Sequence, residues 1–243
     1  MDSKYYFQEQ FKIRSSEVDI HGKARLQSIC NLLQEVAGNH ALALNFDISQ
    51  LMEKDLTWVL HRLHVVMGRL PDWRETITIK TWPSSGDTLR AYRDFQIFGE
   101  DGNEIGRSLS YWLMLNIKSR RPVRMPDEIL EMAPTDVEHV LDIKSNRLSP
   151  LEKRDYSTEF KVRRSDLDMN NHVNNVKYIG WALETLPEEI KIKEIDIEFQ
   201  AECLVDDFIF SESRGDKDGK YIHQLSKKEN SKIVALAETK PFT

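Results

Sequence analysis

The sequence predicts an α+β protein made of two copies of one unit, in which antiparallel strands accompany a helix. Two runs, residues 26–44 and 176–184, have apolar residues at the spacing of a helix face. Each is followed by strand-like runs separated by polar turns, some containing glycine, which is typical of an antiparallel meander. The chain has 243 residues and is long enough for one large domain or two of ordinary size.

The first copy begins with a strand-like run at residues 5–14 that is rich in aromatic and β-branched side chains. A polar turn at residues 15–23 leads into the helical run 26–44, which is so apolar that we expect it to be buried on several sides. A short amphipathic piece follows at residues 49–54. Four strand-like runs complete this copy, at residues 58–70, 75–82, 89–98 and 105–117.

A region that contains several prolines, residues 118–155, is the least regular part of the chain. We interpret it as a long connector with one short helical piece at residues 127–132. The expected organisation is a first domain at residues 1–135, a linker at 136–155 and a second domain at 156–243.

The second copy repeats the element order of the first. When Phe11 is placed on Phe160, an offset of 149 residues (160 − 11), the segment Phe11–Asp19 aligns with Phe160–Asp168 through identical Phe, Lys, Arg, Ser and Asp residues. The helical run 176–184 comes next, and Pro187 ends it. Four strand-like runs follow, at residues 190–201, 208–213, 220–227 and 232–239. The repeated order indicates an internal duplication.

The loop Ser165–Asn175, before the second helix, holds the densest cluster of side chains that can take part in catalysis. Asp168, Asn170 and His172 occupy alternate positions just ahead of a helix N-terminus. The N–H groups of a first helical turn lack intrahelical partners and favour negative charge, which suits catalysis. Asp and Asn also cap helices and form turns, so this composition alone fits a helix cap equally well.

The first copy provides a control for this loop. Asp19 aligns with Asp168, but His21 takes the place of Asn170 and Lys23 the place of His172. Because the first copy lacks the Asn-x-His pair and still precedes a helix, we interpret the pair as functional. Asp168 is retained in both copies, so a structural role for it is equally consistent with the comparison.

The segment Asp166–Trp181, which reads Asp-Leu-Asp-x-Asn-x-His-Val-Asn-Asn-Val-Lys-Tyr-Ile-Gly-Trp, closely resembles the acyl-acyl-carrier-protein (acyl-ACP) thioesterases of plants and bacteria. Residues 32–40, 56–67 and 111–116 resemble the helix and strands of that family's first half. The resemblance implies two tandem hotdog domains, each a long central helix wrapped by an antiparallel β-sheet. The first would bind the acyl chain around a degenerate site, and the second would be catalytic.

The resemblance also implies the catalytic residues. The family's Asp-x-Asn-x-His matches Asp168, Asn170 and His172, and its carboxylate–cysteine pair, expected on the strand after the catalytic helix, matches Glu202 and Cys203. The implied reaction is hydrolysis of fatty acyl-ACP to free fatty acid and carrier protein, without a cofactor or a metal.

Two mechanisms are open. In the first, Glu202 and His172 position and deprotonate a water, Asn170 orients the water or the substrate, and N–H groups at the helix start bind the oxyanion. In the second, Cys203 is the nucleophile and His172 its base. A small, half-buried core residue is the simpler interpretation of Cys203, which favours the water route.

Two further groups of residues are candidates for substrate recognition. The first helix and the strand from Trp58 to Met67 form the expected acyl-chain pocket, although a plain hydrophobic core gives the same pattern. The candidate pocket residues are Leu33, Val36, Ala37, Trp58, Val65 and Met67. A basic cluster, defined as Lys118, Arg120, Arg121 and Arg124, is either a solvated strand end or a docking site for the acidic carrier protein.

Composition excludes several classes of protein. The net charge of −6 argues against bulk nucleic-acid binding, and no run is long and apolar enough for a transmembrane helix. Two cysteines, Cys30 and Cys203, are too few for a disulfide framework, and no Cys/His spacing indicates a zinc site. The first residues lack signal-peptide and transit-peptide character, so we expect a cytoplasmic, bacterial-type protein.

Three functional hypotheses follow. The first is an acyl-ACP thioesterase, and the second is a related hotdog enzyme, either an acyl-CoA thioesterase or a hydroxyacyl-thioester dehydratase. The third, a non-catalytic acyl-binding module, is disfavoured by the complete set of Asp168, Asn170, His172 and Glu202. Tandem hotdogs already form an internal pseudo-dimer, so both a monomer and a homodimer are compatible with the sequence.

Overall fold

The structure, a computed structural model, describes residues 5–133, 137–217 and 219–242 and divides into two compact units, residues 1–143 and 144–243. The division falls inside the stretch 136–155 that the sequence marks as a linker. Residue 136, the first of that linker, and residues 1–4, which entered the expectation about targeting segments, lie outside the described residues. No helix among the described residues is long and apolar enough to cross a membrane.

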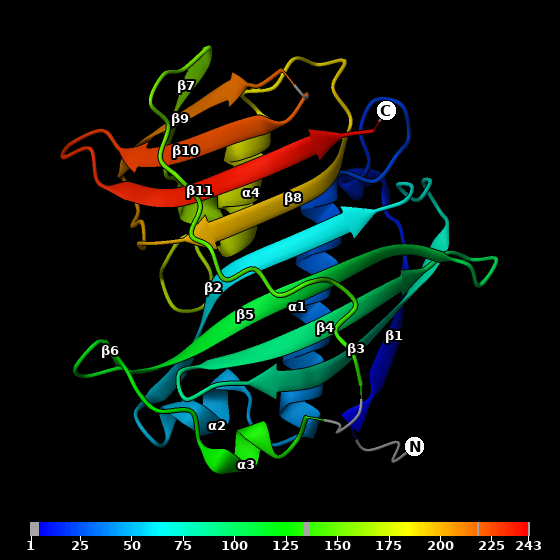
Figure 1. Ribbon diagram of the computed structural model, residues 1–243, viewed down its shortest axis with the longest axis vertical. Helices are drawn as coiled ribbons and strands as arrows, with labels where there is room; N and C mark the ends of the chain where they lie inside the picture. The colour runs from blue at the N-terminus through cyan, green and yellow to red at the C-terminus, as the bar shows by residue number, and fades with distance from the viewer. Residues whose placement is uncertain (1–4, 134–136, 218, 243) are drawn as a thin grey trace. The chain divides into compact units, whose positions relative to one another are not determined.

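In the first unit the helix α1 (Leu26–Ala43) lies along one face of an antiparallel sheet (Figure 1). The strands run in the order β1-β3-β4-β5-β2, and the two-residue β6 pairs with β5. Their bounds are β1 (Phe7–Lys12), β2 (Leu56–Met67), β3 (Thr76–Gly86), β4 (Arg90–Phe98), β5 (Glu104–Asn116) and β6 (Arg121–Pro122). Three short helices complete the described part of the unit, η2 (Ser15–Glu17), α2 (Ile48–Met52) and α3 (Asp127–Leu130).

The periodicity of the apolar residues explains why one face of α1 is buried. Ile29, Cys30, Leu33 and Val36 recur at helical spacing, and each is at most 1% exposed. Along β3, alternate residues such as Ile77 and Ile79 are fully buried, as the period of a strand requires when one face of a sheet covers a core.

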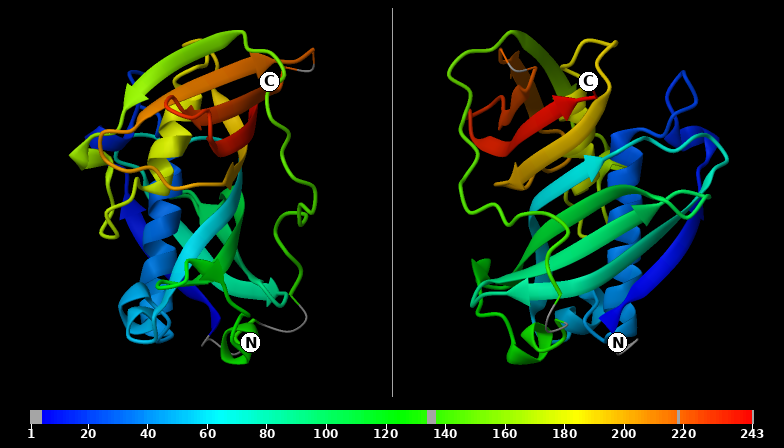
Figure 2. Two further views of the ribbon diagram at one scale, coloured as in Figure 1. Left: turned by 90° about the vertical axis from the view of Figure 1, so that its left-hand side faces the viewer. Right: turned by 45° about the vertical axis from the view of Figure 1, so that its right-hand side comes forward.

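In the second unit the shorter helix α4 (Asn175–Leu183) lies along a sheet whose strands run in the order β8-β11-β10-β9-β7 (Figure 2). All pairs in this sheet are antiparallel. The bounds are β7 (Tyr156–Lys161), β8 (Ile192–Phe199), β9 (Phe208–Gly215), β10 (Tyr221–Lys227) and β11 (Ile233–Pro241), with a short helix η3 (Arg164–Asp166) after β7.

Two contacts fix α4 on its sheet. The Ser211 hydroxyl donates to the Trp181 carbonyl at 2.8 Å, and the Trp181 ring stacks on Phe160 of β7 with 5.8 Å between centroids. The predicted α+β class and the tandem of helix-and-sheet units are confirmed. The sequence did not indicate β6, and α4 has nine residues, half the length of α1.

Candidate active site

A tight loop between η3 and α4 carries Asp168, Asn170 and His172. The Asp168 N–H donates to the His172 carbonyl at 2.8 Å, and the Asn171 N–H donates to the Asp168 carbonyl at 3.1 Å. Asn171 adopts a positive φ of 61°, a conformation that Asn tolerates better than most residues. The loop therefore closes on itself, so that residues 168 and 172 are held side by side.

The Asp168 carboxylate stabilises this loop from within. Its Oδ1 accepts hydrogen bonds from the N–H groups of Asn170 at 2.8 Å and His172 at 3.3 Å. These contacts satisfy backbone donors that the turn would otherwise leave unpaired. Asp168 thus acts directly on the backbone that carries both other members of the predicted motif.

The first copy has the same loop at the predicted offset of 149 residues. Oδ1 of Asp19 accepts from the N–H groups of His21 at 2.9 Å and Lys23 at 3.0 Å. The Asp19 N–H donates to the Lys23 carbonyl at 2.8 Å, and the Gly22 N–H donates to the Asp19 carbonyl at 3.0 Å. The predicted alignment is confirmed bond by bond, with Gly22, at φ 75°, in the place of Asn171.

His172 lies beside Glu202. Nε2 of the imidazole is 3.3 Å from Oε2 of the carboxylate, and the two side chains are 28% and 39% exposed. A base next to an imidazole and open to solvent can hold and deprotonate a water molecule. The structure therefore brings together two residues that are thirty positions apart in the chain.

The expectation that Glu202 and Cys203 lie on a strand is wrong. β8 ends at Phe199, and both residues belong to the loop that leads to β9. The N–H groups of Gln200 and Ala201 both donate to the Val234 carbonyl, at 2.9 and 3.2 Å, which ends the regular ladder with β11. The chain then turns away, and Glu202 can face His172 instead of pairing within the sheet.

Tyr178 of α4 fixes the loop around Glu202, a role that the sequence reasoning missed. Its hydroxyl accepts from the Cys203 N–H at 2.9 Å and donates to the Ala201 carbonyl at 3.4 Å. The Cys203 carbonyl in turn accepts from the Val173 N–H at 3.1 Å. These bonds tie the residues on both sides of Glu202 to the helix and to the loop of His172. A polar hydroxyl on the buried face of an apolar helix was the available signal.

Replacing Tyr178 with phenylalanine tests this role. We expect the free energy of unfolding to fall by about 1–3 kcal/mol, because the buried N–H of Cys203 loses its acceptor. We also expect kcat for thioester hydrolysis to fall by about 10-fold or more with little change in KM, since Glu202 loses its position while the substrate contacts remain. Tyr156→Phe, at an exposed tyrosine, is the matched control. An unchanged kcat in Tyr178→Phe contradicts the positioning role.

Cys203 is fully buried. Burial raises the pKa of its thiol above the usual value, which reduces the fraction of thiolate at neutral pH. The same environment raises the pKa of the Tyr178 phenol. Cys203 has the surroundings of a core residue rather than those of an exposed, activated nucleophile.

The start of α4 offers fewer free donors than expected. The side chain of Asn174 accepts from the Val176 N–H at 2.9 Å, and its carbonyl accepts from the Lys177 N–H at 2.8 Å. These two first-turn N–H groups are therefore engaged in capping, which leaves fewer helix-start donors for the predicted binding of the oxyanion. The amide of Asn170, which is exposed, is a donor that remains suitable for that task.

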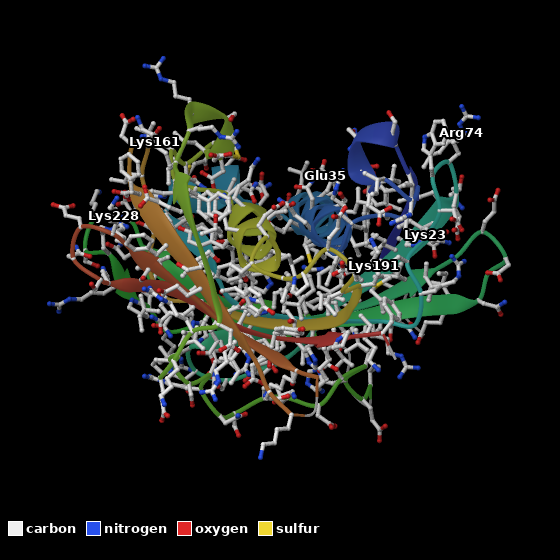
Figure 3. The ribbon with its side chains drawn as sticks, turned by 90° about the horizontal axis from the view of Figure 1, so that it is seen from above. Lys23, Glu35, Arg74, Lys161, Lys191 and Lys228 are labelled. Carbon is white, nitrogen blue, oxygen red and sulfur yellow. The ribbon has the colours of Figure 1, made fainter. Side chains whose placement is uncertain are left out.

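The first copy lacks the carboxylate as well as the imidazole. The Ala24 N–H donates to the Pro71 carbonyl at 2.8 Å, as the Val173 N–H does to that of Cys203. Pro71 thus takes the place of Cys203, and Leu70 that of Glu202. Lys23 (labelled in Figure 3) instead pairs with Asp72 at 2.7 Å, and a lysine ammonium has no acceptor with which to activate water.

The six candidate pocket residues lie in or against the core of the first unit. Leu33, Val36, Ala37, Val65 and Met67 are buried, whereas Trp58 is half-buried. The indole N–H of Trp58 donates to the Phe46 carbonyl at 2.8 Å, and its ring meets that of Trp112 edge-on at 6.4 Å.

A cavity of about 230 Å³ is present at the end of α1, and none of the six candidates lines it. Its walls are formed by Tyr6, Phe7, His40, Ala43, Leu44, Asn45 and Met132. Burial lowers the pKa of His40 to about 3, so this histidine is neutral.

All four members of the basic cluster are exposed. Lys118 pairs with Asp55 at 2.5 Å and Arg124 with Asp127 at 3.0 Å. Arg121 lies on β6, and Arg120 directly precedes it. Exposed ion pairs of this kind are weak, so a charged partner can compete with Asp55 and Asp127 for these side chains.

Comparison with known protein families covers both units. The family model described as acyl-ACP thioesterase N-terminal domain matches residues 4–133, and the model for the acyl-ACP thioesterase C-terminal domain matches residues 150–240.

Similar proteins of known name include plant enzymes. The oleoyl-acyl carrier protein thioesterase 2, chloroplastic, of Arabidopsis thaliana is 33% identical over 93% of this chain and 67% of that protein. The oleoyl-acyl carrier protein thioesterase, chloroplastic, of Coriandrum sativum is 34% identical over 84% of this chain. The matches span 67% and 61% of the lengths of these two curated relatives.

Solved structures resemble the chain over nearly its whole length. The 12:0-ACP thioesterase from Umbellularia californica aligns with a TM-score of 0.86 at 29% identity, over 97% of this chain and 96% of that one. An acyl-ACP thioesterase from Bacteroides thetaiotaomicron aligns with a TM-score of 0.88 at 24% identity, over 98% of both chains, and shows the shared fold.

Proposed function

Since the chain belongs to the acyl-ACP thioesterase family, we propose that it hydrolyses fatty acyl-ACP to free fatty acid and carrier protein. The pair formed by His172 and Glu202 carries this proposal, with 3.3 Å between Nε2 and Oε2. It occurs in the second copy, whereas Lys23 and Leu70 occupy the equivalent places in the first.

In the proposed mechanism, Glu202 and His172 together hold a water molecule beside their contact and accept its proton. The hydroxide attacks the thioester carbonyl carbon, and Asn170 donates to the developing oxyanion or orients the water. When the C–S bond breaks, the proton passes to the thiolate of the carrier protein's prosthetic arm. Such general-base assistance contributes about 10²–10⁴-fold to the rate, and one oxyanion donor about 10²–10³-fold.

A substrate panel tests the function. The purified protein is incubated with acyl-ACP and acyl-CoA of several chain lengths, and free thiol and fatty acid are measured. We expect equal amounts of both products and a higher kcat/KM for the carrier-protein substrates. Preference for CoA supports the acyl-CoA thioesterase alternative, and dehydration of a 3-hydroxyacyl thioester without thiol release supports the dehydratase. No reaction with any substrate contradicts the enzymatic proposal.

Substitution of Cys203 by alanine distinguishes the two chemical routes. We expect activity to stay within about 3-fold of wild type, because the thiol is buried and its raised pKa disfavours the nucleophilic thiolate. Steady-state hydrolysis of acyl-ACP provides the measurement. A loss of about 10³-fold or more with an unchanged melting temperature supports an acyl-cysteine intermediate and contradicts the water route.

We further propose that the basic cluster docks the carrier protein. With a net charge of −6, the chain needs a local positive surface to attract an acidic partner. Double charge reversal at Arg120 and Arg121 is expected to raise KM for acyl-ACP about 10-fold, through slower association, and to leave KM for acyl-CoA unchanged. Charge reversal at Lys153 and Lys232, two exposed residues outside the cluster, makes the same change in net charge and is the control. An equal effect of both double variants contradicts docking at the cluster.

We infer that the acyl chain enters the first unit near α1 and β2, where the six candidate pocket residues lie.

We also infer that the reaction takes place in the cytoplasm. Both cysteines are unpaired, as in proteins of reducing compartments.

A further inference from the structure

A second group of side chains that can take part in catalysis lies in the first unit and shares no residue with the site of His172 and Glu202. His139, which follows α3, lies between a carboxylate and a hydroxyl. Its Nδ1 is 2.7 Å from Oδ2 of Asp94 on β4, and its Nε2 is 2.7 Å from Oγ of Ser85 on β3. Hydroxyl, imidazole and carboxylate thus form one continuous chain of hydrogen bonds.

The proton positions follow from the partners. An ionised carboxylate only accepts hydrogen bonds, so Nδ1 of His139 donates to Asp94. In the neutral imidazole, Nε2 is then left as an acceptor, and the Ser85 hydroxyl donates to it. The Val140 N–H donates to the other oxygen of Asp94 at 2.9 Å, so the carboxylate holds both the ring and the backbone next to it.

Burial increases from the hydroxyl to the carboxylate. Ser85 is exposed, the His139 side chain is 18% exposed and that of Asp94 is fully buried. The ring of Tyr92 meets the His139 ring edge-on at 5.8 Å and restricts its rotation. A reactive serine needs this order, in which the nucleophile is accessible and the group that orients its base is withdrawn from water.

The backbone at Ser85 is built to present this side chain. Ser84 pairs with Tyr92 and Gly86 with Ala91, so Ser85 is the extra residue of a β-bulge. Bulges re-aim side chains and are common beside active sites. A Cβ on Gly86 would lie 2.6 Å from the Arg90 carbonyl oxygen, which means that only glycine fits the close approach of β3 to β4 at this position.

We propose that Ser85 is a second nucleophile of this protein, with His139 as its base and Asp94 as the residue that orients the base, and that it accepts small acyl groups from esters or thioesters. Because Ser85 is exposed, an acyl group bound there stays in contact with water, which suits a short chain better than a long apolar one. This inference does not depend on the function proposed for Glu202 and His172.

The reaction has two steps. Oγ of Ser85 attacks the carbonyl carbon, its proton passes to Nε2 of His139, and the bond to the leaving group breaks while that group takes up the proton as a thiol or an alcohol. An acyl ester remains on Ser85. A water molecule, deprotonated by His139, then attacks this ester, which releases the carboxylic acid and restores the hydroxyl.

A structural clamp is the competing explanation. The bonds from His139 and Val140 to Asp94 attach the segment after α3 to β4, and Leu141 packs against Tyr92, Leu109 and Tyr111. A clamp needs the Asp94 contacts but not the reactivity of the Ser85 hydroxyl. The test therefore measures covalent reaction at Ser85 rather than stability.

An alkyl fluorophosphonate, which phosphonylates activated serines, is incubated with the full-length protein, and the labelled peptide is mapped by mass spectrometry. We expect one label per chain on Ser85 and none on this peptide in Ser85→Ala. The labelling rate should fall about 10²-fold or more in His139→Gln. It should be unchanged in Ser84→Ala, which removes the neighbouring hydroxyl, and in His172→Ala.

Two further measurements separate activation from folding. Ser85→Ala keeps the bonds from His139 and Val140 to Asp94, so its melting temperature should equal that of the wild type. Loss of label in Ser85→Ala then reports the missing hydroxyl and not unfolding, even if His139→Gln loosens the segment after α3. The labelling rate of the wild type should follow a single ionisation with pH, and this dependence should disappear in His139→Gln. Absence of label on Ser85, or equal rates in the wild type and His139→Gln, overturns the proposal.

Discussion

Replacement of His172 by alanine is expected to lower kcat/KM for acyl-ACP about 10²–10⁴-fold, with a melting temperature within a few degrees of wild type. The imidazole is 28% exposed and makes its polar contact with Glu202, so its removal takes away a base without opening the core. Steady-state hydrolysis and thermal unfolding measure the two effects separately.

The first copy supplies the matched control for this substitution. Lys23→Ala changes the equivalent loop position in the copy without the imidazole, and we expect its effect on kcat to be less than about 3-fold. Glu202→Gln keeps the shape of the second partner and removes its charge, and should lower kcat nearly as much as His172→Ala does. If both His172→Ala and Glu202→Gln retain wild-type activity, the catalytic site lies elsewhere.

The second large effect is expected from Asp168→Ala, compared with Asp19→Ala. Each carboxylate accepts two backbone N–H bonds within an equivalent loop, so each substitution should cost about 1–3 kcal/mol in the free energy of unfolding. Denaturant titration of both variants measures this cost.

Activity should separate the two substitutions. Asp168→Ala should lower kcat by about 10²-fold, because the backbone that carries Asn170 and His172 is released, and small displacements of catalytic groups are costly. Asp19→Ala should leave kcat almost unchanged. Equal losses of activity in the two variants contradict the division of labour between the copies, whereas an Asp168→Ala variant that is less stable but fully active assigns Asp168 a structural role alone.

Much of the fold was predictable because its signals are local. The spacing of Ile29, Cys30, Leu33 and Val36 specifies a buried helix face, and the alternation of Ile77 and Ile79 specifies a strand. The duplication was equally readable, since the two loop segments preserve the residues that make the same backbone bonds. The second helix ends near Pro187 in both prediction and structure for the same local reason.

The candidate site was predictable only in part. Asp168, Asn170 and His172 are close in sequence, so their proximity follows from one loop. Glu202 was predicted only from the family resemblance. Its predicted place on a strand was wrong, because the ladder between β8 and β11 ends where the N–H groups of Gln200 and Ala201 both donate to the Val234 carbonyl. The hydroxyl of Tyr178 on a buried helix face was the one local signal of its role, but its two partners are more than twenty residues away and only the structure identifies them.

The sequence by itself therefore determined the class of the fold, its duplication and the identity of the diverged loop, because periodicity, turns and repeats are properties of neighbouring residues. Only the tertiary structure decided which distant groups meet. It places Glu202 3.3 Å from His172, buries Cys203, and brings Ser85, Asp94 and His139 into one chain of hydrogen bonds. The reason is physical: such contacts depend on strand register, on a bulge and on where a loop leaves its sheet, and these are set by packing over the whole unit.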